Sequence, residues 1–274
     1  MKIKHNLDEL GYLKINHQLP LKQINWFKED IVSRKNKEIE KYSKNFLIEN
    51  EAYDIVRNLI RFVPEYIELM QSKWLNEIVD SCLNDFAIIH DYFGMLGTDS
   101  GNKNLTRNKF HRDFPPLGSV RSSIHIMIPL VDVNSKNGAT EVVPATHQMN
   151  QTPSESWLEK NKVVLNAKAG EIFVMDSSLM HKAGINSTST PRTMMILRYQ
   201  LAFIKTPIDL CRVYQEELKG STNLIKTRMG MNCRSMSDLT EIFCPVENKK
   251  WKSGQYKIEN AKITPSAKRN SSPS

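Results

Sequence analysis

The feature that most constrains the fold is a series of short segments with alternating side chains between about residues 86 and 204. Successive side chains of a β-strand point to opposite faces, so a period of two predicts half-buried strands. Turn-forming residues, such as the dipeptide Asn137-Gly138, separate these segments. Six or seven short strands between turns favour a jelly-roll or barrel of antiparallel strands. The expected strands are 86–93, 121–130, 141–144, 163–165, 172–176 and 192–203, and residues 10–15 are a weaker candidate.

The residues before this region favour helices. Ile24, Phe27 and Ile31 recur at helical spacing after Pro20, and similar apolar stripes predict helices over 52–62 and 65–83. Such stripes normally face a protein core. We therefore expect a mainly β fold with flanking helices, in which the N-terminal helices buttress one sheet of the β core.

The length of 274 residues suits a single large domain. We expect this domain to span residues 1–260, with the β core at about 86–204 and a disordered basic tail at 261–274. No apolar run is long enough to span a membrane, and acidic residues at positions 8 and 9 do not fit a secretory signal. The four cysteines match no metal-binding or redox spacing, so we expect reduced thiols in a cytoplasmic protein.

The net charge of +8 is concentrated near the C-terminus. Residues 249–274 carry seven basic residues and one acidic residue, so the remaining chain has a net charge of about +2. A basic tail rich in Ser and Pro is usually solvated. We therefore do not expect nucleic-acid binding.

Three elements of the sequence contain residues that could form a functional site: His111-Arg112-Asp113, His181 and Arg192. Two residues separated by one position share a face in an extended segment, so His111 and Asp113 can reach one ion. With His181 as a third ligand, they form the set that suits Fe(II) with open coordination positions. The tripeptide alone has little weight, because about 0.3 matches are expected by chance with seven His. On that evidence alone, His111 is better interpreted as a surface histidine.

The order of several segments resembles the phytanoyl-CoA dioxygenase family of Fe(II)- and 2-oxoglutarate-dependent oxygenases. The resemblance covers roughly residues 86–204, and the distal His181 precedes Arg192 by eleven positions, as in that family. Ala145 and Thr146 depart from the usual Gly-Ser of the family. The segments that carry the resemblance are His111-Arg112-Asp113, 137–147 (NGATEVVPATH), 169–176 (AGEIFVMD) and 181–186 (HKAGIN) followed by Arg192.

The resemblance implies a double-stranded β-helix, a cupin-like jelly-roll, that holds Fe(II) through His111, Asp113 and His181. It implies that Arg192 binds the far carboxylate of 2-oxoglutarate and that His125 contributes a polar contact, although a structural role for His125 is about equally supported. The reaction with O2 would release CO2 and succinate and would hydroxylate an unactivated C–H bond. Because Asp113 is present, we do not expect the halogenation found where a small residue replaces it.

Two alternatives to a hydroxylase are a binding protein with a silent metal site and a metal-dependent jelly-roll enzyme that does not use 2-oxoglutarate. The complete ligand set argues against the first and Arg192 argues against the second. The substrate is not readable from the sequence. We expect a small molecule, such as a metabolite, a lipid-like compound or a natural-product intermediate. Basic residues near the motif mildly favour an anionic one. Arg121 and Phe114 are candidate substrate contacts, and the sequence does not indicate an oligomeric state.

Overall fold

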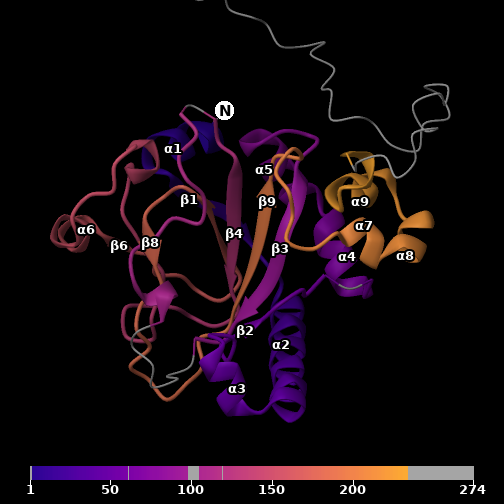
Figure 1. Cartoon of the computed structure of the whole chain (residues 1–274), viewed down its shortest axis with the longest axis horizontal. Coiled ribbons are helices and arrows are strands. Elements are labelled where there is room, and N and C mark those ends of the chain that lie inside the picture. Colours follow the sequence, from indigo (N-terminus) through magenta and orange to yellow (C-terminus); the bar gives the residue numbers. More distant parts are fainter. Residues whose placement is uncertain (1, 61, 98–104, 119, 234–274) are drawn as a thin grey trace, which may run out of the picture.

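Two antiparallel β-sheets form the centre of the computed structural model, which describes residues 2–60, 62–97, 105–118 and 120–233 (Figure 1). The larger sheet has the strand order β1-β7-β4-β9-β3-β2, and the smaller has the order β6-β5-β8. The larger comprises β1 (Tyr12–Gln18), β7 (Glu171–Asp176), β4 (Ser123–Pro129), β9 (Met194–Gln200), β3 (Ile88–Met95) and β2 (Ile55–Val56). The smaller comprises β6 (Val163–Val164), β5 (Glu141–Val142) and β8 (His181–Lys182). The expected mainly β architecture is confirmed.

The alternation of strand β4 assigns its two faces to two different cores. Ile124, Ile126 and Ile128 are fully buried in a core shared with the N-terminal helices. Met127 points to the opposite face, where residues of both sheets form a second core. Each buried isoleucine contributes about 1.5–3 kcal/mol to the folded state, so a slip of one residue in the strand would be strongly opposed. This register fixes which side chains of β4 and β9 face the interior of the barrel.

Helices cover the outer face of the larger sheet and its edges. In Figure 1, α7, α8 and α9 gather beside α4, while α6 lies at the opposite side near β6. Phe27 of α2 packs against Trp26 and Tyr66 in the core beneath the sheet. The helices are α1 (Lys2–Leu10), α2 (Leu21–Tyr42), α3 (Lys44–Glu49), α4 (Pro64–Gln71), α5 (Lys73–Cys82), α6 (Glu155–Asn161), α7 (Leu210–Val213), α8 (Gln215–Lys219) and α9 (Asn223–Arg228).

The helix expected over residues 52–62 is wrong. The segment contains strand β2, which pairs with β3. The buried ammonium of Lys35 donates hydrogen bonds to the carbonyl oxygens of Ala52 and Ile55 at 2.9 and 2.7 Å. The Leu59 N–H donates to the carbonyl of Tyr92. Tertiary partners therefore satisfy backbone groups that a helix would have paired internally.

The helix expected over residues 65–83 is interrupted. Helix α4 ends at Gln71 and α5 begins at Lys73, because Ser72 between them is extended with ψ 137°. Pro64 stands at the first turn of α4, where its missing N–H costs nothing.

Two further expectations concern membrane-spanning segments and the C-terminal tail. In the described residues, no helix is long and apolar enough to cross a membrane. The basic tail at 261–274 lies outside the described residues, and the domain boundary at 260 stays a prediction.

The close approach of α2 to β3 provides a test of this packing. A Cβ added at Gly94 would lie 2.8 Å from Cγ2 and 2.9 Å from Cδ1 of the buried Ile31. We expect Gly94→Ala to lower the free energy of unfolding by about 1–3 kcal/mol, which exceeds the roughly 0.5–1 kcal/mol that alanine gains over glycine within a strand. Urea denaturation measures this change. Gly220→Ala is the matched control, since its added Cβ meets nothing within 4 Å, and an equally small effect at both positions would contradict the packing.

Candidate metal centre

A reciprocal pair of backbone hydrogen bonds brings His111 and His181 together. The N–H of each residue donates to the carbonyl oxygen of the other, both at 3.0 Å. His181 lies in β8, whose pairing with β5 holds it on the smaller sheet. The N–H of Asp113 then donates to the carbonyl of Ser177. Two distant segments are thus aligned so that three polar side chains converge.

Backbone carbonyls fix the tautomers of the two histidines. Nδ1 of His111 lies 2.8 Å from the carbonyl oxygen of Lys109, and Nδ1 of His181 lies 2.9 Å from that of Leu179. A carbonyl oxygen can only accept, so both Nδ1 atoms carry the proton and donate it. Both Nε2 atoms are then left with a free lone pair. Histidines that bind a metal through one ring nitrogen typically donate a hydrogen bond from the other, as Nδ1 does here.

The charges of the three groups suit a divalent cation. Burial and the nearby His111 lower the pKa of His181 to about 4, against the opposing effect of Asp113, so its ring is neutral at pH 7. Burial raises the pKa of Asp113, but His125, His181 and Arg198 outweigh this and lower it well below its usual range. Asp113 is therefore a carboxylate. A neutral His181 ring and an anionic Asp113 carboxylate thus face the same point of the site.

The ligand atoms of His111, Asp113 and His181 all lie within 4.8 Å of one another, and Nε2 of His181 is 3.5 Å from Oδ2 of Asp113. One ion can be reached by all three residues. Two nitrogens and one carboxylate leave the other side of an iron ion open to further ligands. The residues therefore fit Fe(II).

Arg192 is a buried cation with unmet hydrogen-bonding capacity. Its side chain is 2% exposed, and its Nε and Nη1 atoms have no hydrogen-bond partner in the described part of the chain. Burial, with a further contribution from the charge of Arg107, lowers the pKa of Arg192 to about 10, although Asp54 opposes this. An arginine in this state would be stabilised by an anion, and a carboxylate matches its planar geometry.

His125 also faces the centre. It is 3% exposed, and its Nε2 lies 3.2 Å from Oδ2 of Asp113. The Nε–H of Arg198 donates to the same Nε2 atom at 2.8 Å. Burial and Arg198 lower the pKa of His125 well below its ordinary value. Its contact with 2-oxoglutarate stays a proposal.

Comparison with known families identifies the family of the chain. The family model of phytanoyl-CoA dioxygenase (PhyH) matches residues 7–194, more than half of the chain.

The chain belongs to the phytanoyl-CoA dioxygenase family.

Membership confirms the resemblance seen in the sequence, and with it an oxygenase that uses iron and 2-oxoglutarate. An uncharacterised protein of Mycobacterium tuberculosis is 28% identical over 209 residues, which cover 73% of this chain and 76% of that protein. The iron/alpha-ketoglutarate-dependent dioxygenase ausO of Aspergillus calidoustus is 26% identical, and the alignment covers 59% of each chain. The crystal structure of EctD from S. alaskensis with 2-oxoglutarate and 5-hydroxyectoine has a TM-score of 0.61 at 17% identity, with 73% of this chain and 76% of that chain covered. The likeness to EctD supports the jelly-roll fold.

The two candidate substrate contacts of this PhyH-family protein differ in their surroundings. The guanidinium of Arg121 is committed to ion pairs with Asp176 at 2.9 Å and Asp8 at 2.6 Å. This favours a structural role that ties α1 to β7. The ring of Phe114 lies against that of His90, with centroids 5.7 Å apart, directly after Asp113. Phe114 is the stronger of the two proposals.

Sequence reasoning did not assign roles to Arg198, His90 and Gln200 at this end of the barrel. Arg198 and Gln200 are separated from Arg192 by even numbers of positions in the strand expected at 192–203, so a common strand face was the available indication. His90 could not have been found, because a shift of register between Ile89 and Asp91 re-aims its side chain. Its Nδ1 lies 2.5 Å from the side-chain oxygen of Gln200.

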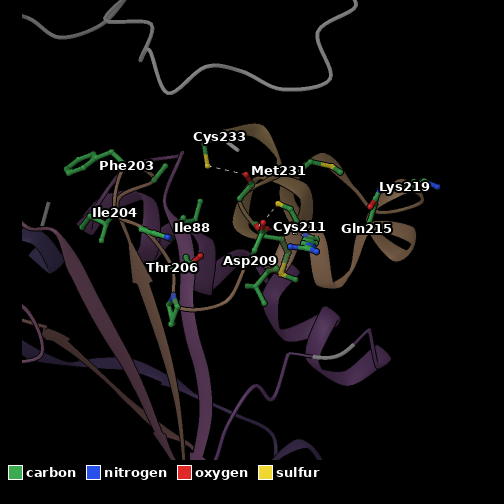
Figure 2. Close-up of a pocket in the computed structure, with 17 residues that line it drawn as sticks. Ile88, Phe203, Ile204, Thr206, Asp209, Cys211, Gln215, Lys219, Met231 and Cys233 are labelled. Carbon is green, nitrogen blue, oxygen red and sulfur yellow. Dashed lines mark hydrogen bonds between the residues drawn. The ribbon is translucent and has the colours of Figure 1, made fainter. Parts of the chain in front are cut away.

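A hollow of ≈ 1150 Å³ lies beyond the ends of β3 and β9, away from the three ligands. Figure 2 shows Phe203 and Ile204 on one side of it and Gln215 and Lys219 on the other. Neither His111, Asp113 nor His181 lines this hollow. The hollow is linked to this end of the barrel through Gln200. The side chain of Gln200 contacts His90 and donates to the carbonyl of Ile204, which lines the hollow, at 2.6 Å.

The ligand set predicts a metal-dependent gain in stability. Co(II) resembles Fe(II) in its preference for such ligands, and it does not require the exclusion of air. At a free concentration of one hundred times Kd, it should add about 2.7 kcal/mol to the stability of the wild type. Differential scanning calorimetry with and without Co(II) measures this gain. We expect it to disappear in His111→Ala and to persist in His5→Ala, which removes an exposed histidine. An undiminished gain in His111→Ala would exclude this histidine as a ligand.

Proposed function

We propose that the protein hydroxylates an unactivated C–H bond of a small molecule, a metabolite, lipid-like compound or natural-product intermediate, while 2-oxoglutarate is decarboxylated to succinate. The observation that carries this proposal is the convergence of His111, Asp113 and His181 in a barrel that also buries the under-satisfied Arg192. Family membership supports the same chemistry.

Three side chains would hold the iron, and the backbone would hold the side chains. His111 and His181 present Nε2 because Nδ1 of each ring donates to a carbonyl. Asp113 supplies the anionic ligand. When bound, the iron activates O2 together with 2-oxoglutarate, which supplies electrons as it loses CO2. The protein's part is to leave one side of the site free and to keep the three ligands from rotating.

Arg192 would bind the far carboxylate of 2-oxoglutarate. Its unpartnered Nε and Nη1 are each available to donate a hydrogen bond to a carboxylate oxygen. Gly97 supports this assignment, since a Cβ there would come within 2.9 Å of the Arg192 Nε. Any larger residue would crowd the guanidinium. His125 would offer a polar contact between the two ends of the co-substrate, from the inner face of β4.

The substrate would meet the iron near Phe114 and His90. An anionic substrate loses support, because most of the nearby cations have protein partners. Arg121 is paired with two carboxylates, Arg107 is 2.5 Å from Asp54, and Arg112 donates to the carbonyls of Thr146 and Met149. We therefore propose a small molecule whose recognition does not require a negative charge.

An anaerobic titration tests the assignment of the cofactors. Adding 2-oxoglutarate to the Fe(II) protein should produce the weak visible charge-transfer band of the chelate, and a succinate-release screen with O2 should then identify substrates. We expect Asp113→Ala to abolish 2-oxoglutarate turnover while leaving the fold intact, because the site loses its only anionic ligand. Circular dichroism controls for folding. Turnover at the wild-type rate in Asp113→Ala would refute the triad.

The role of Arg192 predicts a selective defect. Arg192→Ala removes one partner of a buried charge pair, which typically costs about 2–5 kcal/mol. The KM for 2-oxoglutarate should therefore increase by a factor between about 30 and several thousand. Binding of Co(II) should be retained. Steady-state succinate release measures the KM. Arg212→Ala, at an exposed arginine, is the control. If Arg192→Ala kept the wild-type KM, Arg192 would not contact 2-oxoglutarate.

A further inference from the structure

A second arginine, Arg198, lies on the inner face of β9 beside the candidate metal centre. Its register partners are His125 on β4 and Asp91 on β3. Its side chain is 15% exposed, so most of the guanidinium is removed from solvent. A cation in such a position needs acceptors that hold it there.

The guanidinium contacts two different groups of the centre. Nη2 lies 3.2 Å from Oδ2 of Asp113, and Nε donates to Nε2 of His125 at 2.8 Å. Guanidinium nitrogens in these roles can only donate. Nε2 of His125 must therefore be an acceptor, and any proton on the neutral ring lies on Nδ1.

This tautomer has a consequence for Asp113. Nε2 of His125 and Oδ2 of Asp113 are 3.2 Å apart, and neither atom carries a proton, so two lone pairs face each other. Such a contact is repulsive by itself. Arg198 bridges the two acceptors with two N–H donors and turns the repulsion into a fixed three-residue arrangement.

The oxygen that Arg198 holds is also the one that faces the ligand nitrogen of His181, 3.5 Å away. A carboxylate oxygen can accept a guanidinium on one lone pair and an ion on another. We propose that Arg198 is a positioning residue, which fixes the Asp113 carboxylate and the His125 ring and so prearranges the ligand set for a divalent ion. This inference rests on the metal centre of the proposed function.

Charge and geometry act in opposite directions here, and a suitable variant must separate them. The positive charge of Arg198 repels a divalent cation, whereas its two hydrogen bonds hold the ligand in place. Arg198→Lys keeps the charge but replaces the planar fork by a single ammonium, which does not reproduce both contacts. Loss of binding in this variant therefore reports on geometry.

The experiment is a Co(II) titration followed by visible absorption, without 2-oxoglutarate or turnover. We expect Arg198→Lys to bind Co(II) 10- to 100-fold more weakly than wild type, the usual effect of losing a partner that orients a ligand. The ligand-field spectrum should also change. Arg212→Lys, the same substitution at an exposed position, should match the wild type in both readouts.

The outcomes distinguish this inference from the proposed function. Wild-type affinity and an unchanged spectrum in Arg198→Lys overturn the positioning role alone. A wild-type protein that binds no Co(II) overturns the metal centre and the inference together.

A cycle of Arg198→Lys, His125→Asn and the double variant gives a second test. Residues that act as a unit are not additive, so the double variant should lose little more affinity than Arg198→Lys. Strictly additive losses would show that Arg198 and His125 act independently and would overturn the proposal.

Discussion

The reciprocal backbone bridge between His111 and His181 is the contact on which the rest of the centre depends. It joins a short extended segment to the smaller sheet and sets the two imidazoles with their ring centroids 4.4 Å apart. The same two residues direct Nδ1 to the carbonyl two positions earlier in the chain. Position, orientation and tautomer of both rings are thus determined by main-chain groups. Side-chain substitutions elsewhere can move these two rings only by moving this backbone, in which His181 is paired with Val142 on one side and with His111 on the other.

The interior of the barrel would be a poor place for two arginines if it were only a hydrophobic core. Met127, Phe173 and Ile196 fill its middle. Arg192 lies two residues before β9 begins, and Arg198 lies near the end of that strand. Arg198 has its acceptors within the protein, whereas Arg192 keeps two buried donors without hydrogen-bond partners in the described residues. That difference is why we propose a positioning role for Arg198 and a ligand-binding role for Arg192. A buried cation whose N–H donors lack acceptors destabilises the folded protein. Binding of an anion would offset this free-energy cost.

Sequence patterns predicted the strands well where the two faces of a strand differ in polarity. The alternation of Ile124, Ile126 and Ile128 with Ser123 and His125 defined both faces of β4, because each face meets a different environment. Patterns failed where distant partners decide the local structure. Residues 52–62 have a helical stripe, yet the ammonium of Lys35 and the edge of β3 capture their backbone groups. Likewise, β8 has two residues, so pairing with β5 and His111 defines it, and no local periodicity could have placed His181 in a strand.

The same reasoning explains which site residues the sequence could supply. We propose that His111, Asp113, His181 and Arg192 bind the metal and the co-substrate. Their spacings along the chain resemble those of the family, so the sequence could supply them. Arg198 and His90 belong to the site through cross-strand neighbours. Arg198 meets Asp113 across the barrel, and His90 is turned toward Phe114 and Gln200 by an irregular register. Contacts of this kind depend on the closure of the sheets and not on distance along the chain. If substrate choice resides in this group, then proteins with the same ligand spacing can differ in substrate through changes of register in β3 that leave the three candidate metal ligands untouched.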